Sequence, residues 1–216
     1  PGTLRTQSGT PFSVFTPFSR AFRKSVEIPK VLGAPKTLPP IPADVVCPPL
    51  PLPTLQELGL SHNDRLTPGG ERASHERLKH FLASGAVAYR RERDRMDHSG
   101  TSRLSQDLKF GTLSAAKVWS ALQALRARAG KGGEDGITTF ENELLWREFA
   151  HYSMWERPDL ISKPFRPEFA GFPWRFDETL WSAWVTGHTG YPVVDASARQ
   201  LLRDGFVHNR ARMISA

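Results

Sequence analysis

From residue 71 onward the apolar residues recur at the spacing of an α-helix, and this pattern constrains the fold more than any other feature. In ERASHERLKHFLASGAVAYRRERDR the spacing is carried by Leu78, Phe81, Leu82 and Val87. TTFENELLWREFAHYSMWE shows it strongly, and DETLWSAWVTG, DASARQLLRDG and HNRARMISA predict three further helices. Because no strand alternation follows residue 30, we expect a mainly α protein with an all-helical body.

Local signals mark where several of these helices begin and end. Gly111 suits the position just past the end of a helix, and Ser114 suits the N-cap position of the next helix. Gly187 and Gly205 are expected to close two later helices. The sequence GKGGEDG, residues 130–136, predicts a flexible loop before the next helix.

The chain before residue 71 has a different character. Residues 29–53 hold nine of the eighteen prolines and little helical periodicity, which predicts an extended linker between two domains. Residues 1–28 contain short β-like pieces in PFSVFTPF, followed by the basic amphipathic stretch SRAFRKSVEI. We therefore divide the chain into residues 1–28, a linker over 29–70, and a helical domain over 71–216.

Composition limits the setting and the partners. The 216 residues are 39% hydrophobic and contain no apolar run near the ~20 residues that cross a bilayer, so we expect no membrane association. Cys47 is the only cysteine, which excludes an internal disulfide and a Cys-based zinc site and fits a reducing, cytoplasmic setting. Because the chain opens with Pro1 rather than methionine, we expect a piece of a longer protein.

The net charge is +7, with a pI near 9.9. Such a balance suggests a polyanionic partner, nucleic acid first, although an arginine-rich solvated surface would give the same numbers. The basic residues cluster in RRERDR, at positions 90–95, and again at Arg210 and Arg212. Both clusters lie near aromatic and hydroxyl residues, which a plain solvated face does not require.

Three hydroxyl residues, Thr101, Ser102 and Ser105, crowd one predicted helix start beside Arg103. One hydroxyl is enough for an N-cap, and simple capping is the plainer interpretation of such a start. Hydroxyls, free backbone N–H groups and a guanidinium at a helix N-terminus also form an anion site, most naturally for phosphate. The two interpretations stay open on these residues alone.

Two further stretches carry polar and aromatic residues on one helix face. Glu143, Trp146 and Arg147 are spaced at i, i+3 and i+4, which suits either a salt bridge beside a core tryptophan or the wall of a pocket. The second stretch, HNRARM at residues 208–213, suits either a helix cap with a solvated face or a reader of base edges and phosphates.

Taken in order, the motifs GTSRLSxxLxxGxxS, ELLWREF, WxxGxTGYPVVDAxxRQL and GFxHNRxRMIxA resemble the DNA photolyase and cryptochrome family. The resemblance covers nearly the whole chain. It includes GTPFSVFTPFSRAF, which is similar to the tail of that family's N-terminal α/β domain, so residues 1–28 are expected to be that tail. The HNRxRM form is most similar to bacterial class I cyclobutane pyrimidine dimer photolyases.

The resemblance implies a FAD-binding helical domain, truncated at its C-terminus, of a deoxyribodipyrimidine photo-lyase. Reduced FAD would drive light-dependent repair of cyclobutane pyrimidine dimers in DNA, in a protein expected to be a monomer. It leaves the antenna chromophore open. One alternative is a cryptochrome-like blue-light photoreceptor without repair activity, and another is a non-catalytic basic domain that binds DNA.

The resemblance also assigns roles to single residues. Those expected to bind FAD are Tyr89, Thr101, Ser102, Arg103, Leu104, Ser105, Phe140, Arg147, Asn209 and Arg212. Those expected to act on the lesion are Glu143, Trp146, Asn209 and Met213. DNA contacts are expected from Arg93, Glu143, Trp146, Arg147, Asn209, Arg210 and Arg212, and electron transfer to the flavin from Trp174. No metal site is assigned.

Three positions depart from the family's pattern. Phe140 stands where close relatives often carry a tryptophan, which keeps a stacking surface and loses an N–H donor. Val207 and Ala198 replace methionines and are small apolar adjustments. The resemblance places the rest of the flavin-binding residues after Ala216.

Overall fold

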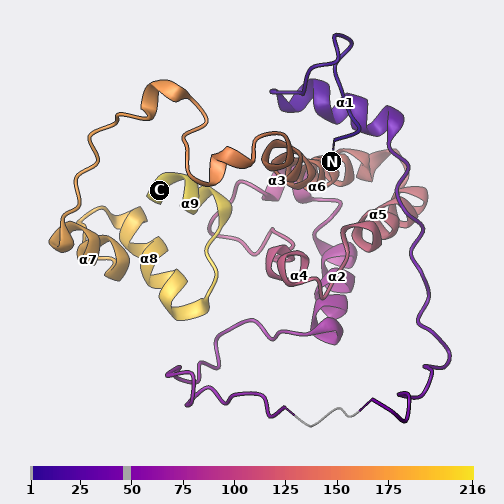
Figure 1. Cartoon of the computed structure of the whole chain (residues 1–216), viewed down its shortest axis with the longest axis horizontal. Coiled ribbons are helices and arrows are strands. Elements are labelled where there is room, and N and C mark those ends of the chain that lie inside the picture. Colours follow the sequence, from indigo (N-terminus) through magenta and orange to yellow (C-terminus); the bar gives the residue numbers. More distant parts are fainter. Residues whose placement is uncertain (1, 46–49) are drawn as a thin grey trace.

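The computed structural model describes residues 2–45 and 50–216, and this part of the chain contains helices and no strands (Figure 1). The mainly α architecture expected from the apolar spacing is confirmed. Cys47 lies outside the described residues, and so does part of the proline-rich segment. None of the helices in the described ranges is both long and apolar enough to cross a membrane.

The core forms where α2 (Glu71–Ser84), α3 (Tyr89–Glu92) and α5 (Ala115–Ala129) meet α6 (Glu134–Glu156). Its members on α2, α5 and α6 are spaced three or four positions apart, so each of these helices turns one apolar face inward. Ala86, Leu104 and Leu113 join the core from the segments between helices. The buried cluster comprises Leu78, Phe81, Ala86, Tyr89, Leu104, Leu113, Val118, Leu122, Ile137, Phe140 and Leu144.

The periodic stretch from residue 71 to 95 forms two helices rather than one. Helix α2 ends before Gly85, whose N–H donates to the Phe81 carbonyl at 2.8 Å, and α3 begins four residues later. Ala86, in the turn between them, is completely buried against the core. The break directs α3 across α6 instead of continuing α2 into solvent.

Helix α6 begins at Glu134, inside the predicted loop 130–136, so that loop prediction is wrong in its second half. Glu134 and Asp135 supply negative charge to the first turn, where the helix dipole favours it. Gly136 permits a close crossing, since a Cβ there would stand 2.0 Å from the Val87 carbonyl oxygen. Gly136, one of the glycines that suggested a flexible loop, therefore packs tightly. A short 3-10 helix, η1 (Lys131–Gly133), precedes α6.

The β-like pieces expected within residues 1–28 are not observed; the segment instead contains α1, Phe15–Ser25. Pro17 lies in the first turn of α1, where its missing N–H costs nothing. Phe18 packs on Phe149 and Tyr152 of α6, at ring-centroid distances of 5.1 and 5.0 Å. Helix α1 therefore lies on α6, while the assignment of residues 1–28 to a preceding domain stays a prediction.

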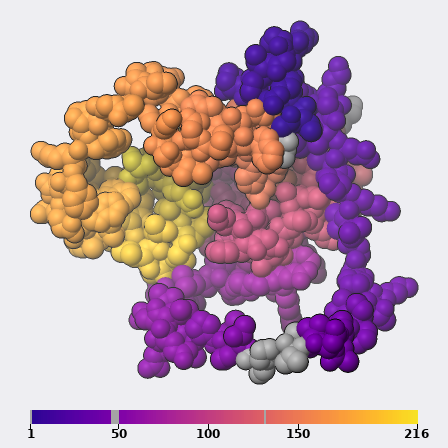
Figure 2. All heavy atoms as spheres, in the orientation of Figure 1, coloured from indigo at the N-terminus to yellow at the C-terminus, as the bar shows by residue number. Residues whose placement is uncertain are grey.

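The linker follows an extended path around the outside of the helices (Figure 1). In the described part of residues 29–70 there is no helix or strand. Its large apolar side chains are exposed, for example Leu32 and Leu52 at 89% each. In the space-filling view this segment runs along the edge of the helical body rather than through it (Figure 2).

The three helices expected near the end of the chain are confirmed as α7 (Glu178–Thr186), α8 (Pro192–Asp204) and α9 (Asn209–Ser215). Gly187 and Gly205 end the first two with left-handed φ values of 72° and 64°. The three pack in sequence as a group at the left of Figure 1. Two 3-10 helices, η2 (Pro158–Ile161) and η3 (Pro167–Phe169), lie on the path from α6 to α7.

Candidate functional site

A cavity of about 530 Å³ opens between α6, the segment around α4 (Ser105–Phe110), and α9. All ten residues expected to hold the cofactor line it, although they come from four separate parts of the sequence. The lining residues are Tyr89, Thr101, Ser102, Arg103, Leu104, Ser105, Leu108, Lys109, Phe140, Glu143, Leu144, Arg147, His151, Phe206, Val207, Asn209 and Arg212.

The hydroxyl-rich segment forms one wall, and capping does not use up its hydroxyls. Helix α4 begins at Ser105, and the N-cap residue, Leu104, has no side-chain cap. Ser102 Oγ accepts weakly from the Leu104 N–H at 3.4 Å. Within the described residues, the hydroxyls of Thr101 and Ser105 make no hydrogen bond. By contrast Ser114 caps α5 as expected, accepting from the Lys117 N–H at 3.1 Å.

The backbone of this wall is unusual at Arg103. Its φ of 53° makes it the one non-glycine residue with positive φ in the described part of the chain. A left-handed non-glycine residue costs of order 1–3 kcal/mol and persists only when its surroundings impose it. Such a reversal of hand turns successive N–H groups toward one side, the arrangement that forms an anion-binding concavity.

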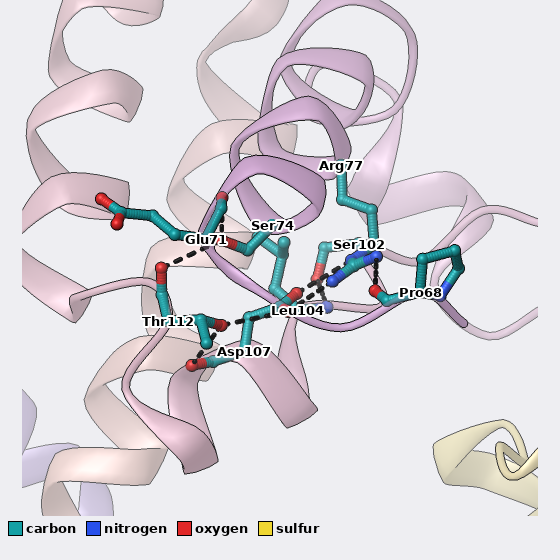
Figure 3. A network of polar contacts seen from close by, with 8 residues as sticks. All are labelled: Pro68, Glu71, Ser74, Arg77, Ser102, Leu104, Asp107 and Thr112. Atoms are coloured by element: carbon teal, nitrogen blue, oxygen red, sulfur yellow. Dashed lines mark hydrogen bonds and ion pairs between the residues drawn. The ribbon is translucent and has the colours of Figure 1, made fainter. Parts of the chain in front are cut away.

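A buried polar network fixes the wall against α2 (Figure 3). Asp107 of α4 is 2% exposed and accepts from Arg77 Nε at 2.9 Å and from Arg77 Nη2 at 2.5 Å. Arg77 also donates to the Pro68 carbonyl at 2.8 Å, which ties the end of the linker to the same point. Ser74 Oγ donates to the Thr112 carbonyl at 3.0 Å, just past the left-handed Gly111 that ends α4 as predicted.

Gly100 allows the segment to pass close to α3. A Cβ at this position would stand 2.6 Å from the Glu92 Cβ and 2.9 Å from the Glu92 carbonyl oxygen. Any larger residue would push residues 101–105 away from α3 and enlarge the cavity. The glycine at the head of the hydroxyl motif therefore has a packing function.

Positive charge predominates along the cavity. Arg103 lies over the Phe206 ring at 4.8 Å, and Arg147 donates to the Leu108 carbonyl of α4 at 3.4 Å and pairs with Glu148 at 3.0 Å. Lys109 and Arg212 pair with no carboxylate in the described ranges. Since Glu143 is the one acidic lining residue, the cavity favours an anionic ligand.

An aromatic corner closes the inner end of the cavity. Tyr89 and Phe140 meet edge to face with ring centroids 5.0 Å apart, and Phe81 packs behind both. Burial, followed by the negative charge of Glu143, raises the pKa of Tyr89 to about 12. The phenol therefore stays protonated at neutral pH and can donate a hydrogen bond.

A chain of charged side chains starts at Glu143, the acidic residue of the cavity lining. Arg93 Nη1 donates to Glu143 Oε1 at 2.6 Å, joining the end of α3 to α6. Arg93 Nε lies 3.5 Å from Asp94 Oδ1, and the same oxygen accepts from Arg210 of α9. Residues that the sequence separates by more than 100 positions thus form one network.

Five of the predicted site residues lie outside the cavity lining: Arg93 and Arg210, which belong to the charged chain above, and Trp146, Met213 and Trp174. Trp146 stacks on Phe15 of α1, with centroids 3.7 Å apart and an interplanar angle of 8°. Met213 lies on α9, where its sulfur accepts weakly from Asn209 at 3.8 Å. Trp174 is 85% exposed beside Phe172. Their roles stay predictions.

The cavity also contains residues to which the resemblance assigned no role. Lys109 lies four positions after Ser105, and His151 lies four positions after Arg147, so helical spacing could have indicated both. Phe206 precedes the HNR motif and supports the guanidinium of Arg103. No periodic signal marks Phe206, because it lies in the loop between α8 and α9.

Comparison with known proteins agrees with the motifs. A family model described as the FAD binding domain of DNA photolyase matches residues 140–216. The chain is 37% identical, over its whole length, to a deoxyribodipyrimidine photo-lyase of Agrobacterium fabrum and 35% identical to that of Escherichia coli. It spans 45% of each, so it is similar to about half of these proteins.

Solved structures show the same similarity in three dimensions. A bacterial class III photolyase from Agrobacterium tumefaciens superposes with a TM-score of 0.79 at 33% identity, over 99% of this chain and 44% of that one. A cryptochrome from Synechocystis superposes with a TM-score of 0.80 at 26% identity, over 92% of this chain and 42% of that one. These neighbours do not decide the subclass, and class I stays a prediction.

The order of the motifs, the helical fold and both kinds of comparison agree. Residues 140–216 thus match the FAD binding domain of DNA photolyase, and the whole chain is similar to about half of the deoxyribodipyrimidine photo-lyases and photolyase structures named above.

Proposed function

We propose that this chain forms part of a light-driven deoxyribodipyrimidine photo-lyase that repairs cyclobutane pyrimidine dimers in DNA. The observation that supports this most is the cavity itself, where unused hydroxyls and basic side chains meet an aromatic corner and a carboxylate held at the mouth. The relatives named deoxyribodipyrimidine photo-lyase make the same activity the leading candidate.

The residues present suit the phosphates of FAD. Thr101 and Ser105 offer hydroxyl donors, the start of α4 offers N–H groups, and Lys109 and Arg212 offer charge that no described carboxylate neutralises. Tyr89 and Phe140 offer a surface for a flat ring. FAD, when bound and reduced, supplies the electron that blue light transfers to the dimer to split its cyclobutane ring.

Glu143 is suited to contact the damaged bases. Its carboxylate lies at the cavity mouth, and Arg93 holds it at 2.6 Å, so it has a fixed direction and a donor beside it. A pyrimidine inside a duplex cannot reach such a cavity, so the dimer has to leave the stack. Its broken pairing lowers the cost of that step. Asn209 lines the same cavity and offers an amide to the flipped bases.

Binding to the DNA backbone would need no base-specific contact. Arg93, Arg210 and Arg212 carry positive charge around the mouth, and phosphate contacts of this kind position a duplex without reading its sequence. The affinity for DNA should therefore fall as salt rises.

The proposal is tested with the full-length protein and an oligonucleotide that carries one pyrimidine dimer. Blue light should restore the undamaged bases, and darkness should not. Glu143→Gln should lower the yield per photon about 10-fold or more, because a hydrogen bond to a charged group is worth about 1.5–3 kcal/mol. Glu76→Gln, in an exposed pair on α2, should leave the yield unchanged.

A protein that binds and photoreduces FAD yet leaves the dimer intact would be a cryptochrome-like photoreceptor, and the repair proposal would be wrong. The observation that supports this second candidate is the structural similarity to the Synechocystis cryptochrome. A purified protein without flavin absorbance would favour a DNA-binding domain without a catalytic role.

A further inference from the structure

Asp94 is linked to the cavity through Arg93, which pairs with the lining residue Glu143. Asp94 lies two residues past the end of α3, and its Oδ1 atom accepts from Arg210 Nε at 2.7 Å and lies 2.7 Å from Arg210 Nη2 in the same ion pair. The same oxygen lies 3.5 Å from Arg93 Nε. One carboxylate oxygen thus lies within ion-pair distance of two guanidinium groups, that of Arg210 on α9 and that of Arg93 at the end of α3.

The pair is accessible to a ligand. The side chain of Asp94 is 57% exposed and that of Arg210 is 37% exposed. The hydrogen bond from Arg210 lowers the pKa of Asp94, so the carboxylate is fully ionised at neutral pH. An exposed ion pair of this kind is worth about 0–1 kcal/mol, so an incoming anion can displace it.

The geometry of the contact resembles the one that a phosphate would make. Arg210 presents the Nε–Nη2 edge of its guanidinium, which is the edge that binds the oxygens of carboxylates and phosphates alike. In the described part of the chain, the guanidinium of Arg210 makes polar contacts only with Asp94 and, weakly, from Nη1 to the Met213 sulfur at 3.6 Å.

We propose that Asp94 occupies, in the DNA-free protein, the position that a backbone phosphate takes on Arg210 when DNA binds. This inference rests on the proposed function and adds a residue that sets the affinity for DNA. Binding exchanges one anion for another on Arg210, and Asp94 is left as a negative charge beside the phosphates. Both effects weaken binding.

The weakening acts on every duplex alike, because the contact is with the backbone and not with the lesion. Damaged and undamaged DNA should therefore lose affinity by the same factor. Undamaged DNA, which lacks the contacts of a flipped dimer inside the cavity, is then the form released first at physiological salt. Asp94 would therefore reduce the binding of the protein to intact DNA. The ratio of its affinities for damaged and undamaged DNA would not change.

The test measures binding of the full-length, FAD-loaded protein to matched duplexes with and without one pyrimidine dimer. Asp94→Asn should raise the affinity for both duplexes by about fivefold at low salt, as expected from losing a surface ion pair and a like charge near phosphate. The ratio between the two affinities should not change. Asp94→Glu keeps the charge and should behave as the wild type.

Asp97→Asn is the matched control. Asp97 lies three residues further along and pairs with Arg95 at 2.6 Å, in its own turn, so the variant changes the net charge equally without touching Arg210. It should raise the affinity less than twofold. Equal gains from Asp94→Asn and Asp97→Asn would reduce the effect to net charge and overturn the proposal. A loss of affinity in Asp94→Asn would show that Asp94 positions Arg210 for DNA, which also overturns it.

Failure of the repair proposal can be told apart from failure of this one. The repair proposal is decided by dimer splitting under blue light, whereas the effect of Asp94 is a ratio of binding affinities between Asp94→Asn and the wild type. A parallel titration with inorganic polyphosphate compares the affinities of Asp94→Asn and the wild type for a polyanion. This comparison can be made even if the wild type binds neither DNA duplex. An unchanged polyphosphate affinity in Asp94→Asn would then count against the proposal.

Discussion

At the scale of single residues, His208 shows what the HNR motif contributes locally. One interpretation of the sequence made Asn209 a helix cap. The N-cap of α9 is instead His208, whose Nδ1 accepts from the Arg210 N–H at 3.1 Å. His208 is 6% exposed, and its Nε2 makes no hydrogen bond within the described residues. Nδ1 can accept only in the neutral ring, so protonation would break the cap that orients Asn209 and Arg210.

The free energy of unfolding should therefore depend on pH, in a direction that the structure predicts. Burial lowers the pKa of His208, and the backbone of Arg93, followed by the charge of Asp94, opposes that shift only in part. The unfolded chain takes up the proton near the ordinary value of about 6.5 while the folded chain resists it, so stability is lost as pH falls below that value. Urea unfolding at pH 7.5 and 5.5 should show a lower free energy of unfolding at pH 5.5.

His208→Asn supplies the control for this prediction. Asparagine keeps a capping oxygen and does not titrate, so the drop between the two pH values should shrink. The other histidines are present in both proteins, and the comparison therefore isolates His208. An equal drop in the variant would assign the pH dependence to other groups.

At the scale of elements, spacing predicted the helices well and their boundaries less well. Three late helices and their closing glycines were predicted, because their stripes and stop signals are local. The start of α6 and the helical form of residues 15–25 were missed, because both depend on partners far along the chain. Gly136 packs on Val87, and α1 lies on the aromatic face of α6.

The close crossing at Gly136 can be tested directly. In Gly136→Ala the new Cβ would stand 2.0 Å from the Val87 carbonyl oxygen, so α6 and the turn before α3 must separate. Overpacking of this kind costs about 3 kcal/mol of unfolding free energy. Gly132→Ala, which has open space around it, should change stability by less than about 0.5 kcal/mol. Equal stability of the two variants in thermal unfolding would contradict the packing account.

The anchor between α2 and α4 makes a second prediction at this scale. Arg77→Ala leaves the buried Asp107 without its partner, which should cost about 3 kcal/mol. Arg72→Ala removes an exposed partner of Glu76 on the same helix and should cost less than about 0.5 kcal/mol. Urea unfolding of both variants would measure the difference, and equal losses would show that the network in Figure 3 does not hold α4.

At the scale of the whole molecule, the cavity depends on segments that only the fold brings together. The family resemblance assigned roles to eleven of the seventeen lining residues, whereas charge and spacing alone left each stretch ambiguous. The network of Arg93, Asp94, Glu143 and Arg210 could not be predicted, because spacing says nothing about which charges on different helices meet. Likewise Trp146 faces α1, a contact that its own helix does not reveal.

The central claim is that the hydroxyl-rich segment binds the phosphates of FAD, and the flavin content of the full-length protein tests it most directly. Thr101→Val combined with Ser105→Ala removes two donors, which at about 1.5–3 kcal/mol each should weaken FAD at least 100-fold. The matched control is Thr139→Val combined with Ser84→Ala, whose hydroxyls donate only to carbonyls of their own helices.

The ratio of absorbance at the flavin band to protein absorbance, measured after purification and dialysis, is the readout. The account predicts a yellow wild type and a yellow control, and a double variant of Thr101 and Ser105 that has lost most of its flavin while keeping its helical circular dichroism. A double variant that retained flavin as fully as the wild type would contradict it.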